Sequence, residues 1–356
     1  MSPRAAFRKQ AMSCEGLGSP FTARLLRLIA DRLEPGGAVA DRILSWRGDI
    51  GSAGASVPLR LAGTLHGLVL DGSAPDLAAQ YPPNGTDDDA LWHAIETALH
   101  THEARIQTWL DSPPQTNEVR RSAALIAVAH WLSARTGLPL ILSEIGASAG
   151  LNLHWDRYAL RLPGATFGPD QPVLTLSPDW AGPLPPAVRP RIADRRGVDL
   201  NPLNPADPAH VLRLLSYIWP DQPDRMERTR AALTLPPAPV DQADAVDWLG
   251  PRLAARHPGH VHLICHTVAW QYLPAEAQSR GEAIIAAAGA QATADAPLAW
   301  FGMEADGHAP GAALTLRLWP GDVTIPMGRA DFHGRWIDWQ APAPEGAVKN
   351  FTTPRE

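Results

Sequence analysis

The chain has 356 residues, of which 45% are hydrophobic and 19% are charged. These proportions are typical of a folded protein long enough for two domains, and they exclude a disordered chain. Thirty-one basic and 37 acidic residues leave a net charge of −6, which argues against nucleic acid as the main partner. We find neither a signal peptide nor an apolar run of about 20 residues that would span a membrane, so we expect a cytoplasmic protein.

The first part of the chain is predicted to be helical. Apolar residues recur at helical spacing from Phe21 to Leu33 and from Leu91 to Trp109. A third helix is predicted over 117–134, and Gly137 follows it where a helix commonly ends in a left-handed residue. We therefore expect an all-helical N-terminal domain over residues 1–137.

Residues 138–345 are predicted to form an α/β domain. Short apolar runs predict buried strands over 140–145, 261–265 and 298–303, and amphipathic segments predict helices over 208–218 and 275–288. Strands that alternate with helices favour a doubly wound, mostly parallel, Rossmann-like sheet.

Two parts of this domain depart from that alternation. Residues 155–192 are rich in proline and glycine and contain two short candidate strands, 158–162 and 173–176, so we expect an insertion there. Near the C-terminus, alternating apolar residues in 314–318 and a short strand over 335–339 predict an antiparallel hairpin at a sheet edge.

The most specific local pattern is Glu144 to Gly150 (EIGASAG), directly after a predicted strand. Small residues allow the backbone to turn sharply and to approach a ligand closely. The segment is similar to the glycine-rich loop of class I S-adenosylmethionine-dependent methyltransferases, with Ser148 in place of the middle glycine. The resemblance implies that Gly146, Ser148 and Gly150 pass beside the ribose of S-adenosylmethionine, and that Glu144 lies beneath its methionine part.

Two other interpretations of this segment remain open. The segment also matches the G-x-S-x-G nucleophile elbow, which would make Ser148 the nucleophile of a serine hydrolase. Glu304 or Asp306 would then be the acid of the triad, and His308 or His333 its base. The third interpretation is a tight turn between a strand and a helix that binds no ligand.

Two later acids extend the methyltransferase comparison. Asp199 ends a short predicted strand, where the resemblance implies a carboxylate that accepts hydrogen bonds from the ribose hydroxyls. Asp244, followed by Ala245, would accept one from the adenine amino group. Each acid also has a local alternative, since Asp199 would suit the cap of the following turn and Asp244 a solvated turn.

The segment after the fourth predicted strand contains the candidate catalytic residues. His266 ends the strand, and ligands bind outside the carboxyl ends of strands in open α/β sheets, so His266 is a candidate general base. Tyr272 is a second catalytic candidate and Trp270 a candidate for binding the acceptor. The alternative for His266 is a structural polar network. No metal is expected, because a single strand cannot direct His260, His262 and His266 at one ion.

Three residues at the start of the third predicted helix are candidates for binding the substrate. In the simpler interpretation, Thr116 or Asn117 caps the helix and the charges of Glu118 and Arg121 form a solvated first turn. In the other interpretation, Glu118 and Arg121 lie on one helix face and lean over the ligand site.

The order of motifs along the chain resembles that of an uncharacterised bacterial family, the domain of unknown function 2332. The motifs are QTNEV at 115–119, EIGASAGLNL at 144–153, GVDLNPLN at 197–204 and WPDQ at 219–222. This family provides no activity to transfer. The sequence therefore favours S-adenosylmethionine-dependent methyl transfer to a small-molecule acceptor, with a serine hydrolase or a non-catalytic protein of the same fold as alternatives. The oligomeric state does not follow from the sequence.

Overall fold

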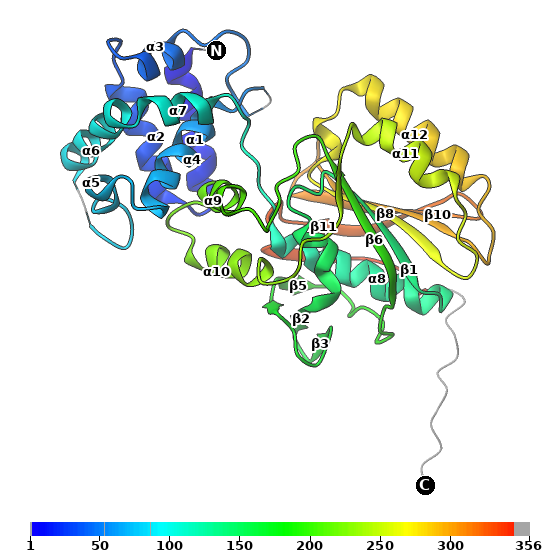
Figure 1. Ribbon diagram of the computed structural model, residues 1–356. Coiled ribbons are helices and arrows are strands. Elements are labelled where there is room, and N and C mark those ends of the chain that lie inside the picture. The colour runs from blue at the N-terminus through cyan, green and yellow to red at the C-terminus, as the bar shows by residue number, and fades with distance from the viewer. Residues whose placement is uncertain (1, 53, 86, 345–356) are drawn as a thin grey trace. The chain divides into compact units, whose positions relative to one another are not determined.

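A computed structural model describes residues 2–52, 54–85 and 87–344 of the chain. The chain folds into two compact units (Figure 1). The first contains Met1–Thr116 and Asn204–Arg230, and the second contains Asn117–Leu203 and Ala231–Glu356. This division differs from the predicted boundary after residue 137, because the chain returns to the first unit between the second and third parallel strands.

The first unit consists of helices. They are α1 (Pro3–Gly16), α2 (Pro20–Arg32), α3 (Ala38–Leu44), α4 (Val57–Leu70), α5 (Pro75–Ala78), α6 (Asp88–Thr101), α7 (Glu103–Leu110), α9 (Pro208–Ser216) and most of α10 (Pro223–Ala232). Polar side chains define several starts: Ser2 caps α1, Ser19 caps α2 and Asp87 caps α6, each accepting a hydrogen bond from a backbone N–H. The core surrounds α4, which is buried along most of its length.

Small residues on α4 allow α9 and α7 to approach it closely. A Cβ atom on Gly63 would lie 2.4 Å from the ring of Tyr217, directly after α9. A Cβ atom on Gly67 would lie 2.8 Å from Trp109 of α7. The predicted helix over 208–218 therefore exists, but it packs in the helical unit and not on the sheet.

The second unit is built on a nine-stranded sheet with the order β5-β12-β11-β10-β9-β8-β1-β6-β7. The strands are β1 (Leu140–Ile145), β5 (Asp179–Ala181), β6 (Ile192–Asp199), β7 (Val240–Gln242), β8 (Val261–Thr267), β9 (Leu298–Glu304), β10 (Ala312–Trp319), β11 (Val323–Ala330) and β12 (Trp336–Trp339). The five neighbouring strands β7, β6, β1, β8 and β9 are all parallel. Beyond β9, each of the strands β10, β11 and β12 is antiparallel to the strand before it. The prediction of a large, mostly parallel sheet after N-terminal helices is confirmed.

Helices cover both faces of this sheet. Helices α11 (Ala245–Ala254) and α12 (Ala275–Gly289) pack together on one face over a core that includes Ile145, Val198 and Ile264. Helix α8 (Ser122–Thr136) lies on the other side of the sheet (Figure 1). It ends at Gly137, whose φ of 68° is the predicted left-handed cap.

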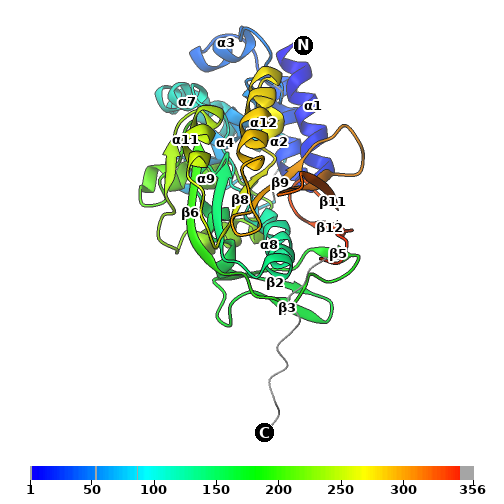
Figure 2. The same cartoon turned by 90° about the vertical axis from the view of Figure 1, so that its right-hand side faces the viewer.

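The predicted insertion is present between β1 and β6. It begins with the 3₁₀ helix η2 (Leu151–Arg157) and forms a small sheet of β3 (Ala165–Phe167), β2 (Tyr158–Leu162) and β4 (Leu174–Leu176). This sheet lies next to α8 (Figures 1 and 2), where the rings of His130 and Phe167 are 5.0 Å apart. The last strand of the insertion, β5, joins the edge of the large sheet beside β12.

The C-terminal hairpin differs from the prediction. The expected direct pairing of 314–318 with 335–339 is wrong, because β11 lies between β10 and β12. Strand β11 contains Pro326 and Gly328, residues that weaken a strand prediction. Pro326 is tolerated because it pairs with Thr315 beside a register shift. Gly328 is needed because a Cβ atom there would lie 1.9 Å from the carbonyl oxygen of Asp338.

Candidate functional site

The candidate site lies at the carboxyl ends of the parallel strands. From β1 the chain proceeds outward through β6 and β7, and then returns to the other side of β1 for β8 and β9. The direction of winding therefore reverses between β1 and β8, the position where ligands bind in open α/β sheets. The predicted residues at or just after these strand ends are Glu144, Gly146, Ser148, Gly150, Asp199, Asp244 and His266.

The loop after β1 has three residues with positive φ: Gly146 at 68°, Ser148 at 53° and Gly150 at 72°. A Cβ atom on Gly146 would lie 2.6 Å from that of Ala269, and one on Gly150 would lie 3.0 Å from Val240. Gly146 therefore allows close contact with the segment after β8, and Gly150 with the start of β7. The loop leads into the 3₁₀ helix η2, so the helix that follows this turn is not an α-helix.

Asp199 connects this loop to the end of β6. Its Oδ2 accepts a hydrogen bond from the N–H of Ser148 at 2.9 Å, and its Oδ1 accepts one from the N–H of Asn201 at 2.9 Å. The predicted capping role is thus present in the structure, and the carboxylate also lies directly beside the glycine-containing loop. No ligand is needed to explain its position.

Asp244 caps α11. Its Oδ1 accepts hydrogen bonds from the N–H groups of Val246 at 2.9 Å and Asp247 at 3.1 Å. The side chain is 43% exposed, and neither bond involves Oδ2. Oδ1 therefore serves the helix, and the Arg280 guanidinium also lies nearest to this oxygen, at 3.7 Å.

Glu144 is the buried acid of the site. It is 3% exposed, and its Oε2 has no hydrogen-bond partner among the described residues. Burial, and to a lesser degree the charge of Asp199, raise the pKa of Glu144 from 4.5 to about 8. The charge of Arg121 and a hydrogen bond with Asn152 act in the opposite direction. Glu144 is therefore mostly protonated at pH 7.

The hydroxyl of Ser148 is a second buried polar group. Ser148 is 3% exposed, and within the described part of the chain its Oγ makes no hydrogen bond. Buried polar atoms nearly always have a partner, because leaving one unsatisfied costs about 1–3 kcal/mol. Glu144 Oε2 and Ser148 Oγ are therefore two buried polar atoms, four residues apart in the sequence, that lack a partner among the described residues.

The segment before α8 packs against the loop. Asn117 Oδ1 accepts a hydrogen bond from the N–H of Leu151 at 2.9 Å, and Ser122 Oγ donates to Asn152 Oδ1 at 2.9 Å. Asn117 does not cap α8, because a 3₁₀ turn, η1 (Val119–Arg121), precedes that helix. It fixes the start of η2 instead.

Glu118 and Arg121 are buried, at 3% and 9% exposure, so the interpretation as a solvated first turn is wrong. The Arg121 guanidinium donates to the carbonyl oxygens of Thr267 at 2.9 Å and Phe332 at 2.8 Å. Through the first of these bonds, Arg121 reaches the end of β8, beside the reversal point. This burial depends on tertiary contacts, which the charge pattern alone does not contain.

His266 is fully engaged within the protein. Its Nδ1 lies 2.8 Å from Glu304 Oε1, and Trp300 Nε1–H donates to its Nε2 at 2.9 Å. Nδ1 therefore carries the proton and donates it to Glu304, and the ring stacks on Trp270 at 5.2 Å. With both nitrogens in use, the arrangement favours the structural polar network over a general base.

Glu304 holds the whole segment that follows β8. Besides His266, its oxygens accept the backbone N–H groups of Ala269, Trp270 and Gln271. Burial opposes ionisation, but the hydrogen bonds from His266 and from these backbone N–H groups outweigh it and keep the pKa of Glu304 below its usual value. From the sequence, Glu304 was predicted only as a hydrolase acid. The sequence signal for its observed role was its position at the end of β9, the strand next to β8.

The same segment contains a strained residue and an exposed one. Val268 has a φ of 54°, which is rare for a β-branched residue and is typical of functional sites when the surrounding contacts enforce it. Tyr272, in the 3₁₀ turn η3 (Trp270–Tyr272), is 65% exposed. The structure therefore separates Tyr272, which faces solvent, from Trp270, which is buried under His266.

The two acids predicted for a hydrolase triad have other partners. Glu304 bonds to His266, and Asp306 pairs with Arg329 at 2.8 Å. In residues 2–52, 54–85 and 87–344, neither acid accepts a hydrogen bond from the ring of His308 or His333. The described residues also contain no group of three or more histidine, cysteine or acidic side chains that could hold a metal ion. No helix among them is long and apolar enough to cross a membrane.

Comparison with known proteins identifies the family. A family model described as "Uncharacterized protein conserved in bacteria (DUF2332)" matches residues 4–339, nearly the whole chain, and the chain belongs to this family. No curated protein and no solved structure matches it.

Proposed function

We propose that the second unit binds S-adenosylmethionine at the carboxyl ends of β1, β6 and β7 and transfers its methyl group to a small-molecule acceptor. The proposal rests mainly on one observation. An acid lies at or just after the carboxyl end of each of three adjacent parallel strands: Glu144 in β1, Asp199 at the end of β6 and Asp244 two residues after β7. The order β7-β6-β1-β8-β9 corresponds to the Rossmann-like arrangement, which binds nucleotide cofactors at this position.

The chemistry of these residues fits the cofactor. S-adenosylmethionine has a sulfonium and an ammonium group, and a cation beside the buried Glu144 would lower the pKa of its carboxyl group and favour the charged form. Its Oε2, which has no partner in the described residues, could then accept a hydrogen bond from the ammonium. Ser148 Oγ can donate or accept a hydrogen bond, and Asp244 Oδ2 can accept one from the adenine amino group. When bound, the cofactor supplies an electrophilic methyl group. The protein's contribution is alignment of that group with the acceptor.

The segment Val268–Tyr272 would form the acceptor side. His266 and Glu304 fix its backbone, so we assign them as positioning residues and not as the base. The exposed Tyr272 is then the side chain of this segment that is available to contact an acceptor.

Calorimetric titration with S-adenosylmethionine, S-adenosylhomocysteine, NAD and NADP tests the cofactor. We expect binding of the first two only. At a hundred times its dissociation constant, a ligand stabilises the native state by about 2.7 kcal/mol, which a thermal unfolding scan detects. Absence of binding by both sulfur compounds to folded protein would overturn the proposal.

Asp244→Ser tests the predicted adenine contact. Serine is as good a helix cap as aspartate, so α11 should keep its start while the second oxygen is lost. We expect about tenfold weaker binding of S-adenosylhomocysteine. The matched control is Asp295→Ser, an exposed acid that precedes β9 at the opposite end of the strands, which should leave binding unchanged. Equal affinity of both variants would remove Asp244 from the site.

A further inference from the structure

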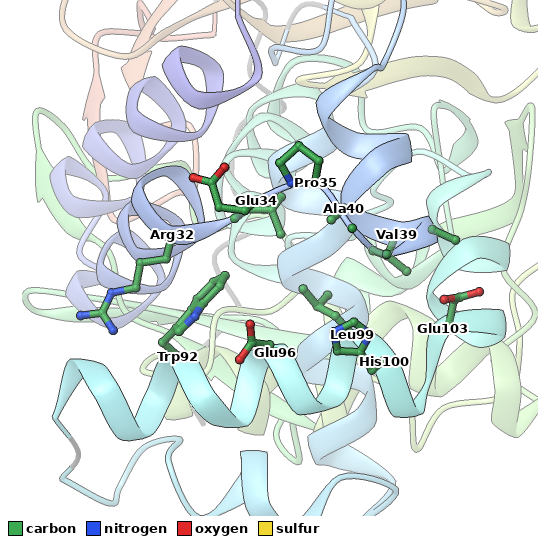
Figure 3. A pocket seen from close by; sticks show the side chains of 14 residues that line it. Arg32, Glu34, Pro35, Val39, Ala40, Trp92, Glu96, Leu99, His100 and Glu103 are labelled. Carbon is green, nitrogen blue, oxygen red and sulfur yellow. The ribbon is translucent and has the colours of Figure 1, made fainter.

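The helical unit contains a pocket of about 260 Å³ that is separate from the candidate site above. It lies between the turn that follows α2 and one face of α6 (Figure 3). Leu33, Val39 and Leu99 are buried and form its apolar floor. All of its lining residues belong to the first unit, so the pocket is a property of that unit alone.

The charges at the pocket are unevenly compensated. Arg32 pairs with Asp89 at 2.7 Å, and Glu34 pairs with Arg4 at 2.8 Å, so these two lining charges are neutralised. Glu96 and Glu103 also line the pocket, and among the described residues neither forms an ion pair. The pocket therefore favours a cation.

The shape and lining narrow the class of cation. Trp92 and Glu96 lie one turn apart on α6 and face the pocket (Figure 3), so an indole surface and a carboxylate are available together. At about 30 Å³ for each water-sized group, the volume holds roughly nine heavy atoms. Trp92 is the one indole of the described lining, so the pocket lacks the aromatic cage that quaternary ammonium ions need. Carboxylates instead suit the three N–H donors of a primary ammonium.

We propose that this pocket binds a short aliphatic diamine. Its hydrocarbon chain would cover Trp92 and Leu99, and its ammonium groups would pair with Glu96 and Glu103. The inference does not depend on the methyltransferase proposal, because it uses none of the residues of the second unit.

Titration calorimetry of the full chain at low ionic strength tests the diamine site, with 1,5-diaminopentane as the probe. We expect saturable binding of one molecule per chain. The neutral 1,5-pentanediol and the quaternary ion choline should bind at least about tenfold more weakly, because each lacks the charge-assisted hydrogen bonds. Choline binding as tightly as the diamine would overturn the assignment to primary amines.

A matched pair of double variants locates the site. Glu96→Gln with Glu103→Gln removes the two carboxylates, and we expect about a tenfold or larger loss of diamine affinity. Asp76→Asn with Glu227→Gln makes the same change of net charge at two exposed residues of this unit outside the pocket, and should alter affinity less than about twofold. All four side chains are exposed, so folding should be preserved. Equal losses in both variants, or no saturable binding to the wild type, would overturn the proposal.

Discussion

At the scale of single residues, the protonation of Glu144 is linked to folding. Its carboxyl group has a pKa of about 8 in the folded protein, against 4.5 for an exposed glutamate. Between these values the native state keeps a proton that the unfolded chain has lost. Folding therefore takes up a proton, and the contribution of Glu144 to stability falls as pH rises.

Comparison with Glu144→Gln isolates this effect. The free energy of unfolding of the wild type, minus that of the variant, should fall with pH between about 4.5 and 8, by at most about 1.4 kcal/mol per pH unit. Wild type and variant must be compared because other groups also titrate. The buried His66 and His130 have pKa values lowered to about 4, so their contribution to stability rises with pH, opposite to that of Glu144. Urea titrations of both proteins at a series of pH values measure this difference in the free energy of unfolding. A difference that is constant across this range would show that Glu144 ionises normally in the folded state.

At the scale of elements, the loop after β1 depends on close packing as well as on turn geometry. Gly146 has a positive φ, and a Cβ atom there would lie 2.6 Å from Ala269. Gly259 also has a positive φ, of 76°, but a Cβ atom there would meet nothing within 4 Å. Alanine at either position would therefore carry the cost of a positive φ, but only at Gly146 would its Cβ atom also collide with another segment.

Alanine substitutions at both glycines separate the two costs. We expect Gly259→Ala to lower the free energy of unfolding by about 1 kcal/mol, the cost of a left-handed alanine. Gly146→Ala should cost about 1–3 kcal/mol more, because Ala269 must move. Urea unfolding of both variants gives the comparison. Equal losses would mean that the segment after β8 moves away without cost and does not constrain the loop.

The same elements show what the sequence can predict. Strand β1 was predicted with its observed bounds, because an apolar run between Pro139 and Gly146 is a local signal. Strand β11 was not predicted, because Pro326 is compatible with a strand only beside the register shift, which depends on the partner strand. Glu144 and the loop were predicted as site residues from their local pattern. The burial of Arg121 and the engagement of His266 by Glu304 depend on residues far away in the sequence.

At the scale of the whole molecule, the path of the chain between the units explains why the domain boundary was not predicted. Residues 204–230 lie between β6 and β7 in the sequence, yet they fold with the N-terminal helices. The contact of Tyr217 with Gly63 holds this segment against α4. A pattern of strands and helices in the sequence gives no information about which unit a helix joins.

Tyr217→Ala tests this arrangement. The side chain is buried at 5% exposure, so its removal leaves a cavity beside α4 and should lower the stability of the first unit by about 3 kcal/mol. Hydrogen exchange measured by mass spectrometry should then show faster exchange in α4, Val57–Leu70, and unchanged exchange in β1 and β8. Tyr272→Ala is the matched control, because the exposed Tyr272 should leave α4 unaffected. Faster exchange in β6 and β7 with an unchanged α4 would place residues 204–230 with the sheet, as the sequence pattern had suggested.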